Sequence, residues 1–319
     1  MKLVFMGTPE FARAILVELA VSRHELAAVV TGPDKPAGRN RKLQPTEVRV
    51  EAERLGLPVI TAGSLKSDVL REKLAAFNAD LFVVAAFRIL PPSLINLPRK
   101  GAINIHASLL PRYRGAAPIN WALINGETET GLTSFYLKEK VDTGDMILRE
   151  RVAIAPTDTY DSLHAKLSGL AGRFTLRTLD LIERGQTEAE AQDDTMATPA
   201  PKIQPEDARI DFGQPAERVH DFVRGLATKP GAFTVFRGNK LKVHRAAVVD
   251  EQPESGSTPG SLLPHKKKLL VACQPGTLEL LRVVPAGKKE MDGGAFINGF
   301  RPQAGESFGQ VFTGVREDL

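Results

Sequence analysis

A short apolar stretch near the middle of the chain carries two polar side chains that could do chemistry. Asn104 and His106 alternate there with Ile103 and Ile105. Side chains along a β-strand point to opposite faces in turn, so the amide and the imidazole share one face and the isoleucines share the other. An amide N–H and an imidazole can together stabilise negative charge on oxygen and move a proton. The spacing therefore predicts a catalytic face at the end of a buried strand.

A later polar segment, Val141-Asp142-Thr143-Gly144-Asp145, supplies a carboxylate. Taken alone, Asp142 is most simply a turn former, Asn104 a turn cap and His106 a hydrogen-bonded strand end. Taken together, the carboxylate, the amide and the imidazole form a set that can exchange protons and stabilise an oxyanion without a metal. The combination favours catalytic roles for Asn104, His106 and Asp142.

The residues that follow His106 predict the wall of a binding pocket. The segment rich in proline and glycine after Ser108 favours a stiff turn rather than a continuing element. Ser108 lacks the G-x-S-x-G pattern of a hydrolase nucleophile, so we do not assign it that role. We expect the turn to offer apolar surface and backbone groups, together with residues at the exit of the preceding strand and beside Asp142. The residues expected to line the pocket are Phe87, Ile89, Leu90, Ser108, Leu109, Leu110, Pro111 and Val141.

Strands and helices alternate along the first two thirds of the chain. A helix is expected to begin with Thr8 as its N-cap and Pro9 in its first turn, and others to cover Asp68–Phe77 and Asp158–Glu183. This alternation predicts an α/β fold, a Rossmann-like and mostly parallel sheet with helices on both faces. Ligands of such sheets bind beyond the carboxyl ends of the strands, where Asn104 and His106 lie. The strands expected are Lys2–Met6, Ala27–Thr31, Leu57–Thr61, Leu81–Ala86, Ala102–His106, Leu132–Leu137 and Met146–Val152.

The composition changes after the long helix. Residues 189–207 are polar and contain three prolines, which is typical of a linker between domains. Beyond them the apolar runs become short and strand-like, and Gly or Pro turns separate them, so we expect a small β-barrel. The expected domains are therefore a catalytic domain at 1–188, a linker at 189–207 and a barrel domain at 208–319. The barrel strands expected are Phe233–Phe236, Leu241–Ala246, Leu269–Ala272 and Leu278–Val284.

Bulk properties exclude several classes of protein. No run approaches the roughly 18 apolar residues of a membrane span, so we expect no membrane association. Cys273 is the single cysteine of the 319 residues, which argues against a disulfide scaffold and a cysteine-based zinc site and favours the cytoplasm. The formal charge of +4 and the pI of about 9.1 suit a polyanionic partner without identifying one.

Two clusters of cations are candidates for contact with such a partner. Lys35, Arg39, Arg41 and Lys42 lie close together in an expected loop, and Lys266–Lys268 lie in the barrel region. On charge alone, the first cluster is more simply explained as a solvated basic loop than as a binding site. The second cluster could equally be an exposed hairpin tip. If either cluster binds nucleic acid, it would neutralise phosphates and make binding dependent on salt rather than on sequence.

The chain resembles the folate-dependent formyltransferases. The resemblance is carried by N-I-H-x-S-L-L-P-x-Y-R-G-A-A-P at 104–118 and D-T-G-D at 142–145. It extends to F-M-G-T-P-E-F-A at 5–12, T-G-P-D-K-P-A-G-R at 31–39, A-R-I-D-F at 208–212 and P-A-G-K-K at 285–289. Order and spacing agree over nearly the whole chain.

This resemblance implies an activity and its partners. The formyl donor would be 10-formyltetrahydrofolate, no metal would take part, and the acceptor would be the α-amino group of methionyl-initiator tRNA. The apolar set would hold the pterin, both basic clusters would contact the tRNA, and the barrel would be OB-like. A monomer acting in the cytoplasm is expected. The alternative is a related formyltransferase acting on an amino-sugar nucleotide; formyltransferases of glycinamide ribonucleotide, normally a single domain, are a further rival.

Overall fold

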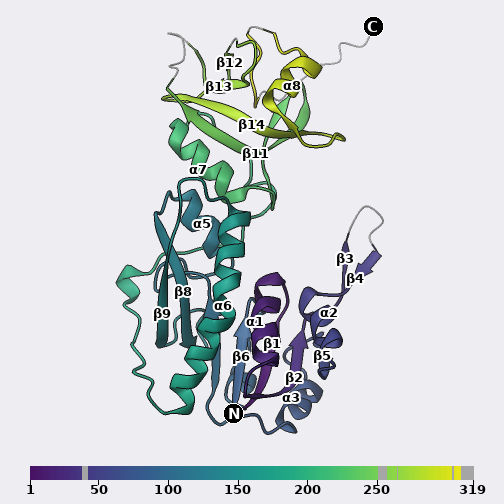
Figure 1. The fold of residues 1–319 in the computed structure, drawn as a ribbon, viewed down its shortest axis with the longest axis vertical. Coiled ribbons are helices and arrows are strands. Elements are labelled where there is room, and N and C mark those ends of the chain that lie inside the picture. Colours follow the sequence, from purple (N-terminus) through teal and green to yellow (C-terminus); the bar gives the residue numbers. More distant parts are fainter. Residues whose placement is uncertain (38–41, 251–256, 264, 304, 310–319) are drawn as a thin grey trace. The chain divides into compact units, whose positions relative to one another are not determined.

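The computed structural model of this chain describes residues 1–37, 42–250, 257–263, 265–303 and 305–309 (Figure 1). The chain forms two compact units, each assembled from three segments. Unit 1 consists of Met1–Pro118, Glu129–Ile154 and His164–Pro201, and unit 2 consists of Ile119–Thr128, Ala155–Leu163 and Lys202–Leu319. Two short segments that interrupt unit 1 in sequence therefore pack with unit 2.

Unit 1 is built on a seven-stranded sheet in the order β5-β2-β1-β6-β7-β8-β9. The first five strands in this order are parallel, while β8 runs antiparallel to β7 and β9 antiparallel to β8. The expected Rossmann-like, mostly parallel sheet is confirmed. The strands are β1 (Lys2–Gly7), β2 (Glu25–Thr31), β5 (Val59–Thr61), β6 (Leu81–Ala85), β7 (Ala102–His106), β8 (Glu129–Tyr136) and β9 (Met146–Ala153).

Helices cover both faces of this sheet. On one face, Val4 and Met6 of β1 pack with buried side chains of α3 and α4. Their neighbours Leu3 and Phe5 are also fully buried, as expected when alternate residues of a central strand face opposite layers. Helices α1 and α6 lie together, since a Cβ on Gly172 of α6 would come within 3.4 Å of the Ala14 carbonyl oxygen of α1. The helices are α1 (Glu10–Ala20), α2 (Glu47–Arg54), α3 (Asp68–Ala75), α4 (Pro92–Ile95) and α6 (Tyr160–Glu183).

The connection from β1 to α1 is tighter than the sequence suggested. Pro9, not Thr8, is the N-cap residue of α1, and no side chain caps the helix. Pro9 has an extended ψ, so the first helical residue is Glu10. A Cβ on Gly7 would lie 2.5 Å from the Cβ of Ala12, which is closer than real Cβ atoms approach. Glycine at this position therefore lets the helix pack directly against the end of the strand.

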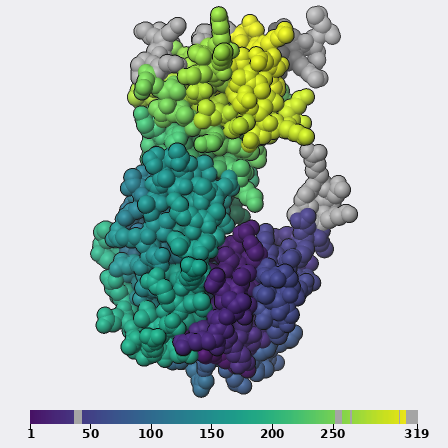
Figure 2. Space-filling view, in the orientation of Figure 1, coloured from purple at the N-terminus to yellow at the C-terminus, as the bar shows by residue number. Residues whose placement is uncertain are grey.

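The first basic segment is a hairpin rather than the expected loop. β3 (Lys35–Ala37) and β4 (Lys42–Gln44) pair antiparallel, with Pro36 opposite Leu43. This violet hairpin stands out from the rest of unit 1 in Figures 1 and 2. Arg39 and Arg41 lie outside the described residues.

Unit 2 contains a six-stranded antiparallel sheet in the order β10-β11-β14-β13-β12, with β15 paired to β14. The sheet curls into a half-barrel, which confirms the expected OB-like C-terminal fold (Figure 1). The strands are β10 (Ala232–Phe236), β11 (Asn239–Val249), β12 (Leu262–Leu263), β13 (Leu270–Ala272), β14 (Thr277–Pro285) and β15 (Met291–Asp292).

Three helices that were not expected from the sequence accompany this sheet. They are α5 (Pro118–Ile124), α7 (Ala216–Leu226) and α8 (Gly293–Phe300). Val219 and Val223 of α7 and Phe296 of α8 enter the core of the curled sheet, where Phe296 packs edge to face on Phe236. The sequence of α8 is rich in glycine, a poor helix former, so burial of Phe296 and the Asp292 cap stabilise it.

A 3-10 helix, η1 (Asp194–Met196), completes the elements of the described chain. Within the described ranges, none of the helices combines the length and the apolar character needed to cross a bilayer.

Candidate active site

β7 places His106 at the edge of the sheet where the candidate site forms. Its neighbours Ile103 and Ile105 are buried, while His106 itself is only 6% exposed. The Nε2 atom lies 2.8 Å from the carbonyl oxygen of Tyr113. A carbonyl can only accept, so Nε2 carries a hydrogen and donates it. The Nδ1 atom is left to face the site.

The carboxylate of Asp142 lies opposite that nitrogen. Its Oδ2 atom is 3.9 Å from His106 Nδ1, and it accepts a hydrogen bond of 2.9 Å from the backbone N–H of Gly115. Asp142 belongs to the loop between β8 and β9 and has a left-handed φ of +52°. Non-glycine residues adopt this conformation at a cost and only where the surroundings hold them there. The Gly115 bond is one such restraint.

Asn104 completes the expected face. It pairs with Val84 of β6 and Phe135 of β8, two residues before His106 on the same strand. It is half-buried, and the described part of the chain offers its side-chain amide no hydrogen-bond partner. The structure thus brings Asn104, His106 and Asp142 to one place, with the amide free to donate to a bound group.

The turn after β7 is held by its own hydrogen bonds. The Ser108 hydroxyl donates to the carbonyl oxygen of Arg112 at 2.7 Å, and the Ser108 side chain is fully buried. Thr133 of β8 donates to the Ser108 carbonyl oxygen at 2.7 Å and accepts from the Leu110 N–H at 3.1 Å. Leu110 packs with Phe135 in the interior. Ser108 and Leu110 therefore shape the turn, and their side chains are not available to a ligand.

The other residues expected to line the pocket have accessible surface, with one exception. Ile89 is 69% and Val141 is 45% exposed. Phe87, Leu109 and Pro111 are half-buried, while Leu90 is buried. Arg88 lies over the Phe87 ring and donates to the carbonyl oxygen of Gly63 at 2.7 Å.

Part of the segment that was expected to be a linker lies against the loops of the candidate site. Glu190 exchanges two backbone hydrogen bonds with Met146, and the Arg114 backbone bonds to Thr198 and Ala200. The Tyr113 N–H donates to the Thr198 hydroxyl at 2.8 Å. Residues 190–200, here called the strap, therefore belong to unit 1. Their polar composition serves hydrogen bonds to the loops of the site, and sequence alone gave no signal for these distant partners.

Of the cations proposed from sequence, Lys35, Lys266 and Lys267 are exposed. Lys268 is half-buried and lies 3.9 Å from Glu279, so part of its charge is already paired. Lys42 begins β4.

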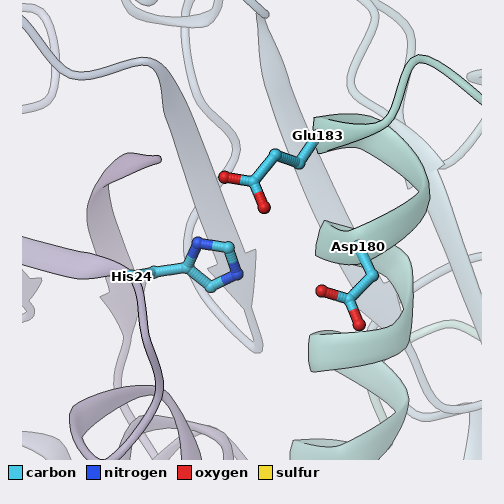
Figure 3. Close-up of side chains that lie close together, drawn as sticks. All are labelled: His24, Asp180 and Glu183. Atoms are coloured by element: carbon cyan, nitrogen blue, oxygen red, sulfur yellow. The ribbon is translucent and has the colours of Figure 1, made fainter.

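One group of side chains in the described chain has the donor atoms of a metal site, and it is an ion-pair network. His24, Asp180 and Glu183 lie close together, with both carboxylates projecting from α6 (Figure 3). Arg23 binds Asp180 at 2.7 Å and Glu183 at 2.5 Å, and the N-terminal ammonium of Met1 binds Glu183 at 3.1 Å, so two cations already pair with the two carboxylates. Burial lowers the pKa of His24. The donor set fits a salt bridge, and among the described residues the candidate active site gathers no comparable group.

The fold of both units and the residues of the candidate site agree with one protein family. The family described as formyl transferase matches residues 1–179, and its C-terminal domain matches residues 202–301. The chain belongs to the formyl transferase family.

Comparison with similar proteins narrows the class of formyl transferase further. It is 45% identical over 307 residues to the methionyl-tRNA formyltransferase of Chlorobium limicola, covering 94% of this chain and 96% of the relative. It is 40% identical over 310 residues to that of Geobacter metallireducens, covering 97% and 99%. Among solved structures it is similar to WlaRD, a sugar 3N-formyl transferase crystallised with dTDP and 5-N-formyl-THF. That likeness has a TM-score of 0.67 and 16% identity, covers 91% of this chain and 99% of the other, and concerns the fold alone.

The close approach of the strap at Gly115 generates a stability prediction. A Cβ on Gly115 would lie 2.5 Å from the Ala200 carbonyl oxygen, and its φ is +128°. We expect Gly115→Ala to lower the free energy of unfolding by about 1–3 kcal/mol and to reduce turnover, because the amide that binds Asp142 must move.

Gly169→Ala is the matched control for that experiment. Gly169 lies in α6 with no atom within 4 Å of an added Cβ. Alanine there should leave turnover intact and raise stability by about 0.5–1 kcal/mol. Denaturant unfolding and initial rates measure both effects. If the two variants behave alike, the strap does not constrain the Gly115 turn.

Proposed function

We propose that this protein transfers the formyl group of 10-formyltetrahydrofolate to the α-amino group of methionyl-initiator tRNA. The observation that carries the proposal is the near full-length similarity to two methionyl-tRNA formyltransferases. The convergence of Asn104, His106 and Asp142 supports it, because this set suits acyl transfer to an amine. The reaction would take place in the cytoplasm, with the protein acting as a monomer.

The chemistry follows from the charges that develop. Attack of the neutral amine on the formyl carbon forms a C–N bond and a tetrahedral intermediate with a negative oxygen and a positive nitrogen. The Asn104 amide donates to that oxygen. His106 can donate toward it only from Nδ1, because Nε2 is engaged by Tyr113, so the donating form carries a hydrogen on both nitrogens.

Asp142 completes the proton transfers. Its carboxylate takes a proton from the attacking nitrogen, and a proton is returned to N10 of the folate as the C–N10 bond breaks. No proton is gained or lost overall, so a single acid/base group is sufficient. The hydrogen bond from Gly115 leaves the second carboxylate oxygen, Oδ1, available for this exchange.

The donor and the acceptor would be held by different parts of the chain. Phe87, Ile89, Leu109, Pro111 and Val141 offer accessible apolar surface to the pterin, and the buried Leu90, Ser108 and Leu110 support the wall from behind. Residues 1–188, completed by the strap, would carry catalysis, and residues 208–319 would bind tRNA. The cations of the first basic segment, Lys35, Arg39, Arg41 and Lys42, and the barrel cations Lys266–Lys268 would neutralise phosphates.

The role of Asp142 can be tested directly. Asp142→Asn preserves size and the left-handed turn but removes the basic carboxylate, so turnover should fall at least about 100-fold. The unfolding midpoint should change little. Asp145→Asn, in the same loop but paired with Lys138, is the control and should retain most of the activity. A near-normal rate for Asp142→Asn would remove Asp142 from the mechanism.

Asn104 should contribute mainly to the transition state. Asn104→Ala should reduce kcat about 10²–10³-fold, the usual loss for an oxyanion donor, while KM for the folate stays within a few-fold. Asn104→Asp, which keeps the shape but cannot donate, should be equally impaired. Asn96→Ala, at the exposed end of α4, is the control. If the folate KM rises while kcat is unchanged, Asn104 binds the ground state.

A third experiment separates a tRNA substrate from an amino-sugar nucleotide. Changing Arg39, Arg41 and Lys42 together to Gln should weaken tRNA binding. The log–log salt slope should also fall, by about 0.7–0.9 for each phosphate that the hairpin no longer neutralises. Folate affinity should not change. Lys66→Gln, Arg71→Gln and Lys73→Gln remove the same charge from exposed positions in and just before α3 and are the matched control.

Binding is measured at three salt concentrations, and formyl transfer is assayed with charged initiator tRNA and with an amino-sugar nucleotide. Unchanged slopes in the hairpin variant would exclude the hairpin as a tRNA-binding element. Transfer to the sugar nucleotide alone would replace the proposed acceptor.

A further inference from the structure

The side chain of Gln192, a residue of the strap, makes four hydrogen bonds to residues outside the strap. Its Nε2 donates to the carbonyl oxygens of Asp142 at 2.9 Å and of Gly144 at 2.8 Å. Its Oε1 accepts from the Nε and Nη2 atoms of Arg114, at 3.0 and 2.8 Å. Two acceptors at one end and a guanidinium at the other fix which end of the amide is nitrogen. Both N–H groups and both lone pairs of this amide are therefore used.

These bonds close a ring around the proposed acid/base group. Gln192 holds the backbone of Asp142 and is itself held by Arg114. The next residue, Gly115, donates its N–H to the Asp142 carboxylate. Two consecutive residues therefore hold Asp142: Arg114 holds its backbone through Gln192, and Gly115 binds its carboxylate directly. Asp194 also binds Arg114 at 2.8 Å, and that guanidinium lowers the pKa of the Asp194 carboxyl.

No side chain of residues 138–143 is buried, so the position of Asp142 depends on hydrogen bonds rather than on packing. Asp142 has a left-handed φ, and Val141 beside it is largely exposed. At Gly144 the chain comes so close to β8 that a Cβ would collide with the Tyr136 carbonyl oxygen. A displacement of about 1 Å at a catalytic group can cost on the order of 100-fold in rate. The bonds from Gln192 to both carbonyls prevent that displacement.

We propose that Gln192 is a positioning residue, which sets the place of the Asp142 carboxylate through the backbone of its loop. The proposal rests on the acid/base role of Asp142 argued above. No other standard side chain of this length both donates to two carbonyls and accepts from a guanidinium. Glutamate keeps the link to Arg114 but has no N–H for the loop, and methionine keeps the volume but makes neither bond.

The expected effect is a loss of turnover without a loss of folate affinity. Gln192→Met and Gln192→Glu should each reduce kcat about 10–100-fold, up to the loss expected when a catalytic group is displaced by about 1 Å. KM for the folate should remain within about threefold, because the apolar wall is untouched. Glu190→Gln is the matched control, since it removes an exposed pair with Arg149 from the same strap without touching the Asp142 loop. It should change kcat less than about twofold.

A double-mutant cycle separates positioning from a merely structural contribution. If Gln192 acts through Asp142, the Asp142→Asn, Gln192→Met double variant should be no slower than Asp142→Asn alone. Losses that multiply would overturn the proposal, as would full kcat in both Gln192 variants. Unfolding midpoints are recorded for all variants. If Gln192→Met does not fold, the isosteric Gln192→Glu takes its place in the cycle.

The same cycle distinguishes the acid/base role of Asp142 from the positioning role of Gln192. Near-normal turnover of Asp142→Asn would overturn the role of Asp142, and the positioning role with it. A slow Asp142→Asn beside a fast Gln192→Met would overturn the positioning role alone. Formyl transfer to initiator tRNA by the unaltered chain tests the acceptor separately.

Discussion

The bond from the Gly115 amide to the Asp142 carboxylate holds the candidate site together. It joins the turn that follows β7 to the loop that follows β8. The oxygen that it engages, Oδ2, is also the one that lies 3.9 Å from His106 Nδ1, so Oδ1 carries neither contact. Neither segment is regular structure, and each includes a residue in the left-handed region, Tyr113 and Asp142. Loops in such conformations keep their geometry only where surrounding contacts over-determine it. The strap supplies these contacts.

The sheet imposes the second constraint. β7 lies between a parallel neighbour and an antiparallel one, so its backbone is paired on both sides and its register is fixed. Because side chains alternate, a fixed register fixes Asn104 and His106 on one face. The antiparallel β8 also brings Thr133 beside the turn, where its hydroxyl binds Ser108 and Leu110. The positions of the amide and the imidazole thus follow from strand pairing, and the position of the carboxylate follows from the strap.

The parts of this arrangement that depend on local pattern could be predicted from sequence. The two-residue period of 102–106 predicted β7 and the shared face, and alternating strands and helices predicted the mostly parallel sheet. The glycine-containing segment around Asp142 predicted a loop. The burial of Ser108 and Leu110 could not be predicted, because an apolar turn has the same sequence pattern whether its side chains face a ligand or the core.

The remaining features arise from contacts that are distant in sequence. Gln192 and Arg114 are joined across the length of β8, β9 and α6, and no periodicity marks such a pair. The hairpin of β3 and β4 is an exception, because its strands are close in sequence; its charge favoured the prediction of a solvated loop. Helix α8 contradicts local propensity and forms because Phe296 is buried against Phe236 and Phe300. In α8, therefore, tertiary packing overrides the local preference.

The most direct measurement of the central claim is a crystal structure with a stable donor analogue that carries its formyl group on N10, such as 10-formyl-5,8-dideazafolate. We expect the formyl oxygen to accept a hydrogen bond of about 3 Å from the Asn104 amide. We also expect Asp142 Oδ1 to face the side of the formyl carbon from which an amine attacks, with the Gln192 and Gly115 bonds intact. A formyl group bound away from Asn104, with the amide engaged by the pterin instead, would contradict the account.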